Sequence, residues 1–218
     1  MSVLQSGITK SLAEAYTIDQ SLRLDDGDSA YLSRTPASEG DRKTWTFSFW
    51  TKRGKLTDYL SFIGAAQDSS NRDTLRFAND DTLNFQWVSG GSSYEFFTDA
   101  VFRDVGAWYH IVLAVDTTIS SPSADRVKMW VNGDAQTFST ANEPAEDYTF
   151  YINDDRLQVI GARTTDGSAA SSYYDGYMAE VYFIDGTQYA ASDFGETDAA
   201  TNQWKPIDAS DLTFGTNG

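Results

Sequence analysis

Two stretches decide the fold: Val127-Lys-Met-Trp-Val-Asn-Gly133 and Tyr174-Asp-Gly-Tyr-Met-Ala-Glu-Val-Tyr-Phe-Ile-Asp-Gly186. In both, apolar and polar residues alternate until Asn-Gly or Asp-Gly ends the run. Alternation with a period of two is typical of a β-strand, and these dipeptides are typical of tight hairpin turns. Each stretch therefore predicts a β-ribbon that turns back on itself.

The same alternation recurs along the rest of the chain. Its clearest case is 44–52, which places Trp45, Phe47 and Phe49 on one face, and we assign this aromatic face to a core. A hairpin is predicted around the turn Asp25-Asp-Gly-Asp28. Further strands are predicted over 59–65, 74–77, 82–88, 93–98, 108–116, 126–131, 135–138, 157–161, 176–184 and 212–214. Because Ser-, Asp- and Gly-rich linkers join them without helices, we predict an all-β fold of two antiparallel sheets.

Composition excludes several classes of function. The 218 residues are 40% hydrophobic and 14% aromatic, enough for one folded domain. With 32 acidic and 16 basic residues, the net charge of −16 argues against nucleic-acid binding. No run of eighteen apolar residues occurs, so we expect no membrane insertion. The absence of cysteine excludes disulfides and thiolate chemistry, and His110 is the single histidine.

A family resemblance rests on six motifs in a fixed order. They are the early hairpin (24–32), the aromatic strand end (49–52), Trp108–Asp116, Val127–Gly133, Leu157–Gly161 and Tyr174–Ile184. Together they resemble the laminin-G-like, concanavalin A-type jelly roll, over roughly residues 20–194. The resemblance implies a jelly-roll sandwich in which the last of these strands lies beside the first.

The two ends of the chain resemble structural proteins of marine tailed bacteriophages. This likeness covers the opening residues 1–32 and the closing segment 195–218. It implies a virion protein, either a tail fibre or a capsid appendage, with other virion proteins as partners and a homo-oligomer, preferably a trimer. Residues 1–19 are then an arm for docking or oligomer contacts, and 195–218 an extension that leads into a further domain.

Three functions remain open at this point. The first is a non-enzymatic virion protein whose sandwich mediates assembly and adhesion to a host-surface glycan. The alternative is a dedicated carbohydrate-binding, lectin-like module. The third is a glycoside hydrolase, because the jelly roll also carries such enzymes.

The hydrolase is the least favoured of the three. In hydrolases of this fold, paired carboxylates alternate on one strand, and the nearest candidates here, Glu143 with Glu146 and Glu196 with Asp198, fall outside such a strand. His110 has no partnered nucleophile motif and is interpreted as a packed strand histidine. We therefore predict no catalytic residue.

Calcium is the cofactor that the sequence suggests. Hard oxygen ligands in loops suit Ca²⁺, and laminin-G-like domains hold this ion through loop acids at the sandwich rim. We select Asp25, Asp26, Asp28 and Asp175, because the resemblance brings the first and last strands together. The same residue types are also ordinary turn formers, so a structural role is the alternative.

Three tyrosines are the candidate ligand-binding residues. Tyr94, Tyr173 and Tyr174 lie in or beside Ser- and Gly-rich loops. An exposed aromatic ring stacks on the face of a sugar, and neighbouring Asp or Asn side chains bind its hydroxyl groups. Contact with a neighbouring subunit is an equally weighted alternative for these tyrosines.

Overall fold

The computed structural model describes residues 16–167 and 169–218, and nearly all of its regular structure is β-strand. Most of the predicted arm, residues 1–15, lies outside this part. The strands are β1 (Leu22–Leu24), β2 (Leu32–Arg34), β3 (Thr44–Arg53), β4 (Leu60–Asp68), β5 (Asn71–Phe77), β6 (Thr82–Ser89), β7 (Ser92–Val101), β8 (Tyr109–Asp116), β9 (Val127–Val131), β10 (Asp134–Ala135), β11 (Phe138–Ala141), β12 (Gln158–Ile160), β13 (Arg163–Thr164), β14 (Ala169–Ser171), β15 (Gly176–Asp185), β16 (Gly195–Thr197) and β17 (Trp204–Pro206). Two single 3-10 turns, η1 (Ser123–Asp125) and η2 (Ala191–Asp193), accompany them.

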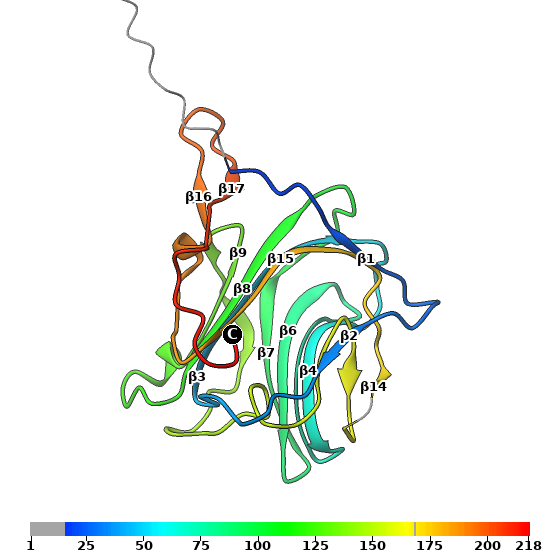
Figure 1. Cartoon of the computed structure of the whole chain (residues 1–218), viewed down its shortest axis with the longest axis vertical. Coiled ribbons are helices and arrows are strands. Elements are labelled where there is room, and N and C mark those ends of the chain that lie inside the picture. Colours follow the sequence, from blue (N-terminus) through cyan, green and yellow to red (C-terminus); the bar gives the residue numbers. More distant parts are fainter. Residues whose placement is uncertain (1–15, 168) are drawn as a thin grey trace, which may run out of the picture.

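The strands form two stacked antiparallel sheets (Figure 1). One has the order β1-β15-β3-β8-β9-β10, and the other β11-β7-β6-β5-β4-β12-β2. β1 pairs with β15, with Leu22 opposite Met178, so the first strand lies beside the returning one as expected. The predicted jelly-roll sandwich is confirmed. Within the described residues, no helix has the length and apolar character needed to cross a membrane.

Several predicted local connections are wrong because the chain changes sheet where a hairpin was expected. The Asp25–Asp28 turn joins β1 to β2, which lie in different sheets. Residues 135–138 likewise divide between β10 and β11, on opposite sheets. After Asp185 no hairpin forms, since its backbone N–H donates to Phe214 O at 2.8 Å. The segment 212–214 therefore lies against the end of β15 but forms no strand.

The Asn132-Gly133 turn, by contrast, is a hairpin as predicted. Its φ values of 52° and 83° are both positive, and β9 pairs with β10 across it. A side chain at Gly133 would also collide with the ring of Trp204, which lies against the turn. The glycine therefore serves the turn and the packing of a distant residue at once.

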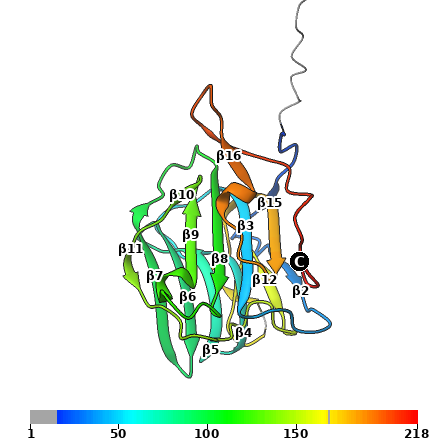
Figure 2. The same ribbon diagram turned by 90° about the vertical axis from the view of Figure 1, so that its left-hand side faces the viewer.

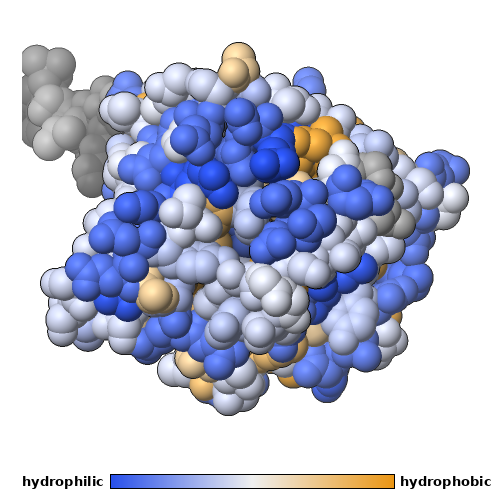
Figure 3. All heavy atoms as spheres, turned by 90° about the horizontal axis from the view of Figure 1, so that it is seen from below, coloured by the Kyte–Doolittle hydropathy of each residue, from blue (hydrophilic) through white to orange (hydrophobic). Residues whose placement is uncertain are grey.

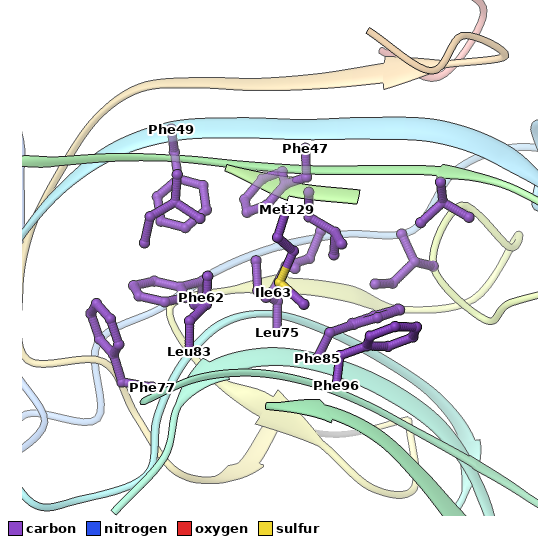
Figure 4. Close-up of a cluster of buried hydrophobic side chains, with 14 of the residues drawn as sticks. Phe47, Phe49, Phe62, Ile63, Leu75, Phe77, Leu83, Phe85, Phe96 and Met129 are labelled. Carbon is purple, nitrogen blue, oxygen red and sulfur yellow. The ribbon is translucent and has the colours of Figure 1, made fainter. Parts of the chain in front are cut away.

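Aromatic side chains fill the space between the two sheets, as Figure 4 shows for Phe47 and Phe49 above Phe62 and Phe85. Trp45, Phe47 and Phe49 are fully buried, which confirms the predicted core face. Burying a side chain of this size contributes about 1.5–3 kcal/mol to stability. This burial stabilises a chain that has no disulfide.

One buried ion pair links the two layers. Arg53, on β3 of the six-stranded sheet, contacts Asp81, in the β5–β6 turn of the other sheet, at 2.9 Å. Both side chains are at most 1% exposed, and Arg53 also donates to Phe102 O. Because such a pair is directional whereas apolar contact is not, it helps to fix how the sheets lie on each other.

The outer face of the six-stranded sheet is covered by the chain itself. Figure 2 shows this sheet face-on, from β10 to β15, with η2 and β16 in front of it. A second apolar cluster forms beneath this cover and includes Val112, Ile184, Phe194 and Trp204. The segment predicted as an extension, 195–218, thus packs on the sandwich, where Asn217 receives hydrogen bonds from Arg34.

Candidate functional site

The seven-stranded sheet also turns a row of side chains away from the core, and this row is polar. It includes Ser61 on β4, Thr74 and Arg76 on β5, and Asn84 and Gln86 on β6. The strand register sets Thr74 opposite Gln86 and Arg76 opposite Asn84. All five side chains belong to residues at most 9% exposed. Polar groups this deeply buried require partners, which makes the face a candidate site.

A short hairpin crosses this face and helps to bury it. A Cβ atom at Gly64 of β4 would lie 3.3 Å from the backbone of both Ala162 and Arg163, so β13 runs directly over the glycine. The missing side chain at position 64 therefore allows β13 to place Arg163 over the sheet.

Three arginines meet where β13 crosses the sheet. Burial, and after it the charge of Arg163, lower the pKa of Arg76 to about 10. The same two causes lower the pKa of Arg72, which precedes Arg76 by four positions on the same face of β5. Like charges at close range repel each other, so this arginine cluster (Arg72, Arg76 and Arg163) is unfavourable in the free protein.

The protein satisfies this cluster only in part. Arg76 Nε donates to Asn84 Oδ1 at 2.8 Å, and Arg163 Nη2 donates to Ser171 Oγ at 3.0 Å. Within residues 16–167 and 169–218, however, the buried Nε atoms of Arg72 and Arg163 have no hydrogen-bond partner. The hydroxyl groups of Ser61 and Thr74 have none there either. Donors left in this way favour a ligand that supplies oxygen acceptors.

The rim of the face adds an aromatic ring and a carboxylate. Tyr59 is 38% exposed, and the Arg76 guanidinium lies 4.5 Å from its ring centre. Glu95 accepts a hydrogen bond from Gln86 Nε2 at 2.5 Å, and its carboxylate is 3.8 Å from Arg76. The candidate face thus presents guanidinium donors, an amide, one carboxylate and a ring face, a set suited to binding a polar ligand.

A cavity lies on the opposite side of the molecule. It measures about 490 Å³, between residues 16–21 and the β16–β17 hairpin, and its walls include Trp50, Trp108 and Trp204. Its aromatic lining contrasts with the polar arginine cluster. Trp50 is only 8% exposed there, whereas Trp108 is 38% exposed.

His110 lies beneath this cavity and is packed within the strand, as predicted. Its ring stacks between Trp50 at 5.0 Å and Trp204 at 5.9 Å. Trp204 Nε1 donates to His110 Nδ1 at 3.0 Å, so the imidazole proton resides on Nε2, 2.9 Å from Ser48 Oγ. Burial lowers the pKa of His110 to about 4, which keeps the ring neutral near pH 7.

The predicted calcium residues gather only in part, and their charges are already compensated. Asp25 and Asp175 both contact Arg23 Nη2, at 3.2 and 3.5 Å, and Asp26 contacts Lys55 Nζ at 2.8 Å. Asp28 is exposed. In the described part of the chain, no group of three or more acidic or histidine side chains is arranged to hold a metal ion. The geometry does not fit Ca²⁺ there, and the site stays a sequence-based prediction.

The three predicted tyrosines have different surroundings. Tyr174 is fully buried, and its hydroxyl lies 2.5 Å from Thr51 Oγ1 and donates to Lys52 O, so its predicted role as a ring platform is wrong. Tyr173 is half-buried and packs near Tyr31. Tyr94 is 39% exposed and stacks on Trp87 at the end of the sheet. The structure does not bring the three together.

The candidate catalytic carboxylates form no acid–base pair. Glu143 contacts the Ser123 hydroxyl, and Glu146 lies 3.9 Å from Arg126. Glu196 and Asp198 both bind Lys205, at 3.2 and 3.3 Å. These contacts agree with the structural roles expected for all four residues.

The sequence-based predictions did not include the arginine cluster, because they concerned carboxylates and tyrosines in or beside loops. A usable signal was present in Asn71–Phe77, where Arg72, Thr74 and Arg76 occupy every second position. On a strand these residues share one face, and two arginines on a sheet face of an acidic protein are unusual. Arg163 offered no such signal, because its placement depends on β13 crossing Gly64.

Comparison with known proteins agrees with this architecture. Residues 25–192 match the family model described as the concanavalin A-like lectin/glucanases superfamily. The chain belongs to this superfamily. No curated protein matches it in sequence.

Solved structures place this concanavalin A-like chain among distant relatives. Domain 4 of the arabinanase AbnA from Geobacillus stearothermophilus, solved in complex with arabinotriose, has a TM-score of 0.52 at 21% identity, over 73% of this chain and 67% of that one. The CBM40 of the Ruminococcus gnavus IT-sialidase gives 0.51 at 14%, over 74% and 95%. Mouse laminin α1 domains LG4-5 give 0.56 at 12%, over 92% and 48%. At these identities the likeness concerns the fold.

Proposed function

We propose that this concanavalin A-like domain is a carbohydrate-binding module that holds a glycan on the outer face of its seven-stranded sheet. The observation that carries the proposal is the set of unpartnered groups on a polar face, namely the hydroxyls of Ser61 and Thr74 and the Nε atoms of Arg72 and Arg163. Within the described residues, the two guanidinium groups are held by one bond each, from Arg72 Nη1 to Ser69 O and from Arg163 Nη2 to Ser171 Oγ. Sugar hydroxyl and ring oxygens supply the acceptors that these donors lack.

Two further features support a sugar as the ligand. Tyr59 offers a partly exposed ring beside the donors, and pyranose rings stack on such faces. In addition, AbnA domain 4, which shares the fold, was solved with an oligosaccharide. Catalysis is not part of the proposal, since the face contributes one carboxylate, Glu95, with no second acid at hydrolase spacing among the partners described for it.

A glycan array probed with the full 218-residue chain tests this function, followed by titration of the bound glycans in solution. The matched pair Tyr59→Ala and Tyr94→Ala then locates the site, because the two tyrosines are almost equally exposed, at 38% and 39%. We expect Tyr59→Ala to weaken binding by about tenfold, as the loss of one stacked ring does, and Tyr94→Ala to change it less than twofold.

Two results would contradict the proposal. If no glycan binds, the domain is no carbohydrate-binding module. If glycans bind and only Tyr94→Ala weakens their binding, the sugar site lies at the loop end of the sheet, beside one of the tyrosines predicted from the sequence.

The biological setting is a second, separate proposal. We propose that the domain serves on a bacteriophage virion, as part of a tail fibre or capsid appendage that meets the host surface, and that it works as a homo-oligomer, with a trimer favoured. Support comes from the resemblance of residues 1–32 and 195–218 to phage structural proteins. Mass spectrometry of purified particles that carry the gene tests the location, and absence of the chain from those particles would refute it.

A further inference from the structure

We propose that the arginine cluster binds the negatively charged group of an acidic sugar, either the carboxylate of a uronic or sialic acid or a sulfate ester. This inference rests on the proposed carbohydrate-binding function and names the class of glycan. Arg72 and Arg76 lie on β5 beneath β13, and Arg163 lies on β13 itself.

The first argument is how the chain treats its other arginines. Six of the seven arginines outside the cluster lie within 4 Å of a carboxylate: Arg23, Arg42, Arg53, Arg103, Arg126 and Arg156. The seventh, Arg34, donates to Asn217 instead. In the part of the chain that the structure describes, Arg72 and Arg163 form no such pair, and Arg76 reaches Glu95 only at 3.8 Å. In a protein with 32 acidic residues, three guanidinium groups at one place with so little negative charge are an exception.

The second argument is energetic. Burial and mutual repulsion lower the pKa values of Arg72 and Arg76, so the free protein holds this arrangement at a cost in stability. A bound anion would remove that cost, and planar guanidinium groups bind carboxylate or sulfate oxygens through paired hydrogen bonds. Sites that destabilise the free protein in this way are typical of binding surfaces.

The remaining groups of the face suit the uncharged part of the same sugar. Gln86 lies opposite Thr74 on the neighbouring strand β6, Glu95 lies opposite Gln86 on β7, and both side chains can bind hydroxyl groups. The Tyr59 ring covers Arg76 from the other side. The overall charge of −16 repels long polyanions, so we expect an isolated acidic residue in an otherwise neutral glycan to be preferred over a heavily sulfated polymer.

The test uses an array on which each glycan backbone is present in neutral, uronic-acid and singly sulfated forms, together with heparin as a polyanion. Arg163→Gln and Arg72→Gln remove donors from the cluster. Arg34→Gln is the control, since it removes one equally charged side chain that contacts Asn217 away from the cluster. Thermal unfolding of each variant confirms that it is folded before binding is measured.

We expect the wild-type chain to bind acidic members at least tenfold more tightly than their neutral counterparts, with the carboxylate and sulfate forms showing which group fits better. Arg163→Gln and Arg72→Gln should each weaken the binding of the acidic forms far more than that of the neutral forms, so that most of the preference is lost, and Arg34→Gln should keep it. Equal binding of acidic and neutral forms, preference for heparin alone, or a preference that survives both cluster variants would overturn this inference and leave the carbohydrate-binding function standing. Absence of binding to every glycan would overturn both.

Discussion

The outer faces of the two sheets differ in what covers them. The six-stranded sheet lies under residues 186–217, and its polar groups are matched by that cover, as where Trp204 Nε1 donates to His110. The β13–β14 hairpin lies over part of the seven-stranded sheet, and donors on this sheet have no partner within the described residues. The end of the sandwich seen in Figure 3 is mostly hydrophilic, with small separate hydrophobic patches. A cover of packed side chains on one side and incomplete hydrogen bonding on the other distinguish the covered face from the proposed binding face.

The largest expected effect is on the covered face. Replacing Trp204 by alanine should lower the free energy of unfolding by about 2–4 kcal/mol, because the change removes a ring packed against His110 and Gly133 and leaves a cavity. Urea unfolding measures the loss. Glycan binding on the other sheet should change less than twofold.

The matched control for that variant is Trp108→Ala. Trp108 borders the same 490 Å³ cavity but is 38% exposed, so its removal should cost about 1 kcal/mol or less. Equal losses for the two tryptophans would contradict the view that Trp204 closes the face.

A pH-dependent effect of intermediate size is expected from His110. Its pKa is about 4 in the folded chain against an ordinary value of 6.5, so between these values only the unfolded chain binds the proton. The contribution to stability is complete above about pH 6.5 and is lost as the pH falls towards 4, by roughly 3 kcal/mol in all. Comparing urea unfolding of wild type and His110→Gln at pH 7, 5.5 and 4 should show a difference that shrinks with falling pH.

The titration of Asp73 changes stability with pH in the opposite direction, so its contribution must be separated from that of His110. Burial raises the pKa of this fully buried carboxyl to about 7, so protonation of the folded chain adds stability as the pH falls from about 7 towards 4. The His110 comparison is therefore repeated in an Asp73→Asn background. A wild-type-minus-variant difference that is constant with pH in both backgrounds would exclude a buried neutral histidine.

The smallest expected effect is on the open face. Arg163→Gln should leave the free energy of unfolding unchanged or raise it by up to about 1 kcal/mol, because it relieves repulsion with Arg72 and Arg76. Arg126→Gln provides the contrast, since Arg126 donates to the carbonyls of Ile119, Ser120 and Pro144 and its loss should cost about 1–3 kcal/mol. If Arg163→Gln destabilises the protein as much as Arg126→Gln, the cluster is structural.

Local patterns in the sequence predicted the fold but not the proposed binding face. The alternation at Trp45, Phe47 and Phe49 and the Asn132-Gly133 turn depend on neighbouring residues, so they could be recognised. The Asp25–Asp28 turn could not be assigned to its sheets, since hairpins and crossovers share the same turn residues. Tyr174 sits in a polar stretch and yet is buried, because its neighbours come from β3 and β4. The arginine cluster likewise joins residues about ninety positions apart.

Gly64 has a consequence for how such a domain diversifies. The β13–β14 hairpin needs a residue without a side chain at position 64 of the sheet beneath it. Its backbone passes 3.3 Å from the place that a Cβ atom would occupy there. Loops of this kind tolerate changes of length and composition far better than strands do. Related chains could therefore differ in this hairpin, and with it in the residue at position 163, while the two sheets and their aromatic interior stay the same. Ligand preference could then change in evolution without a change of fold.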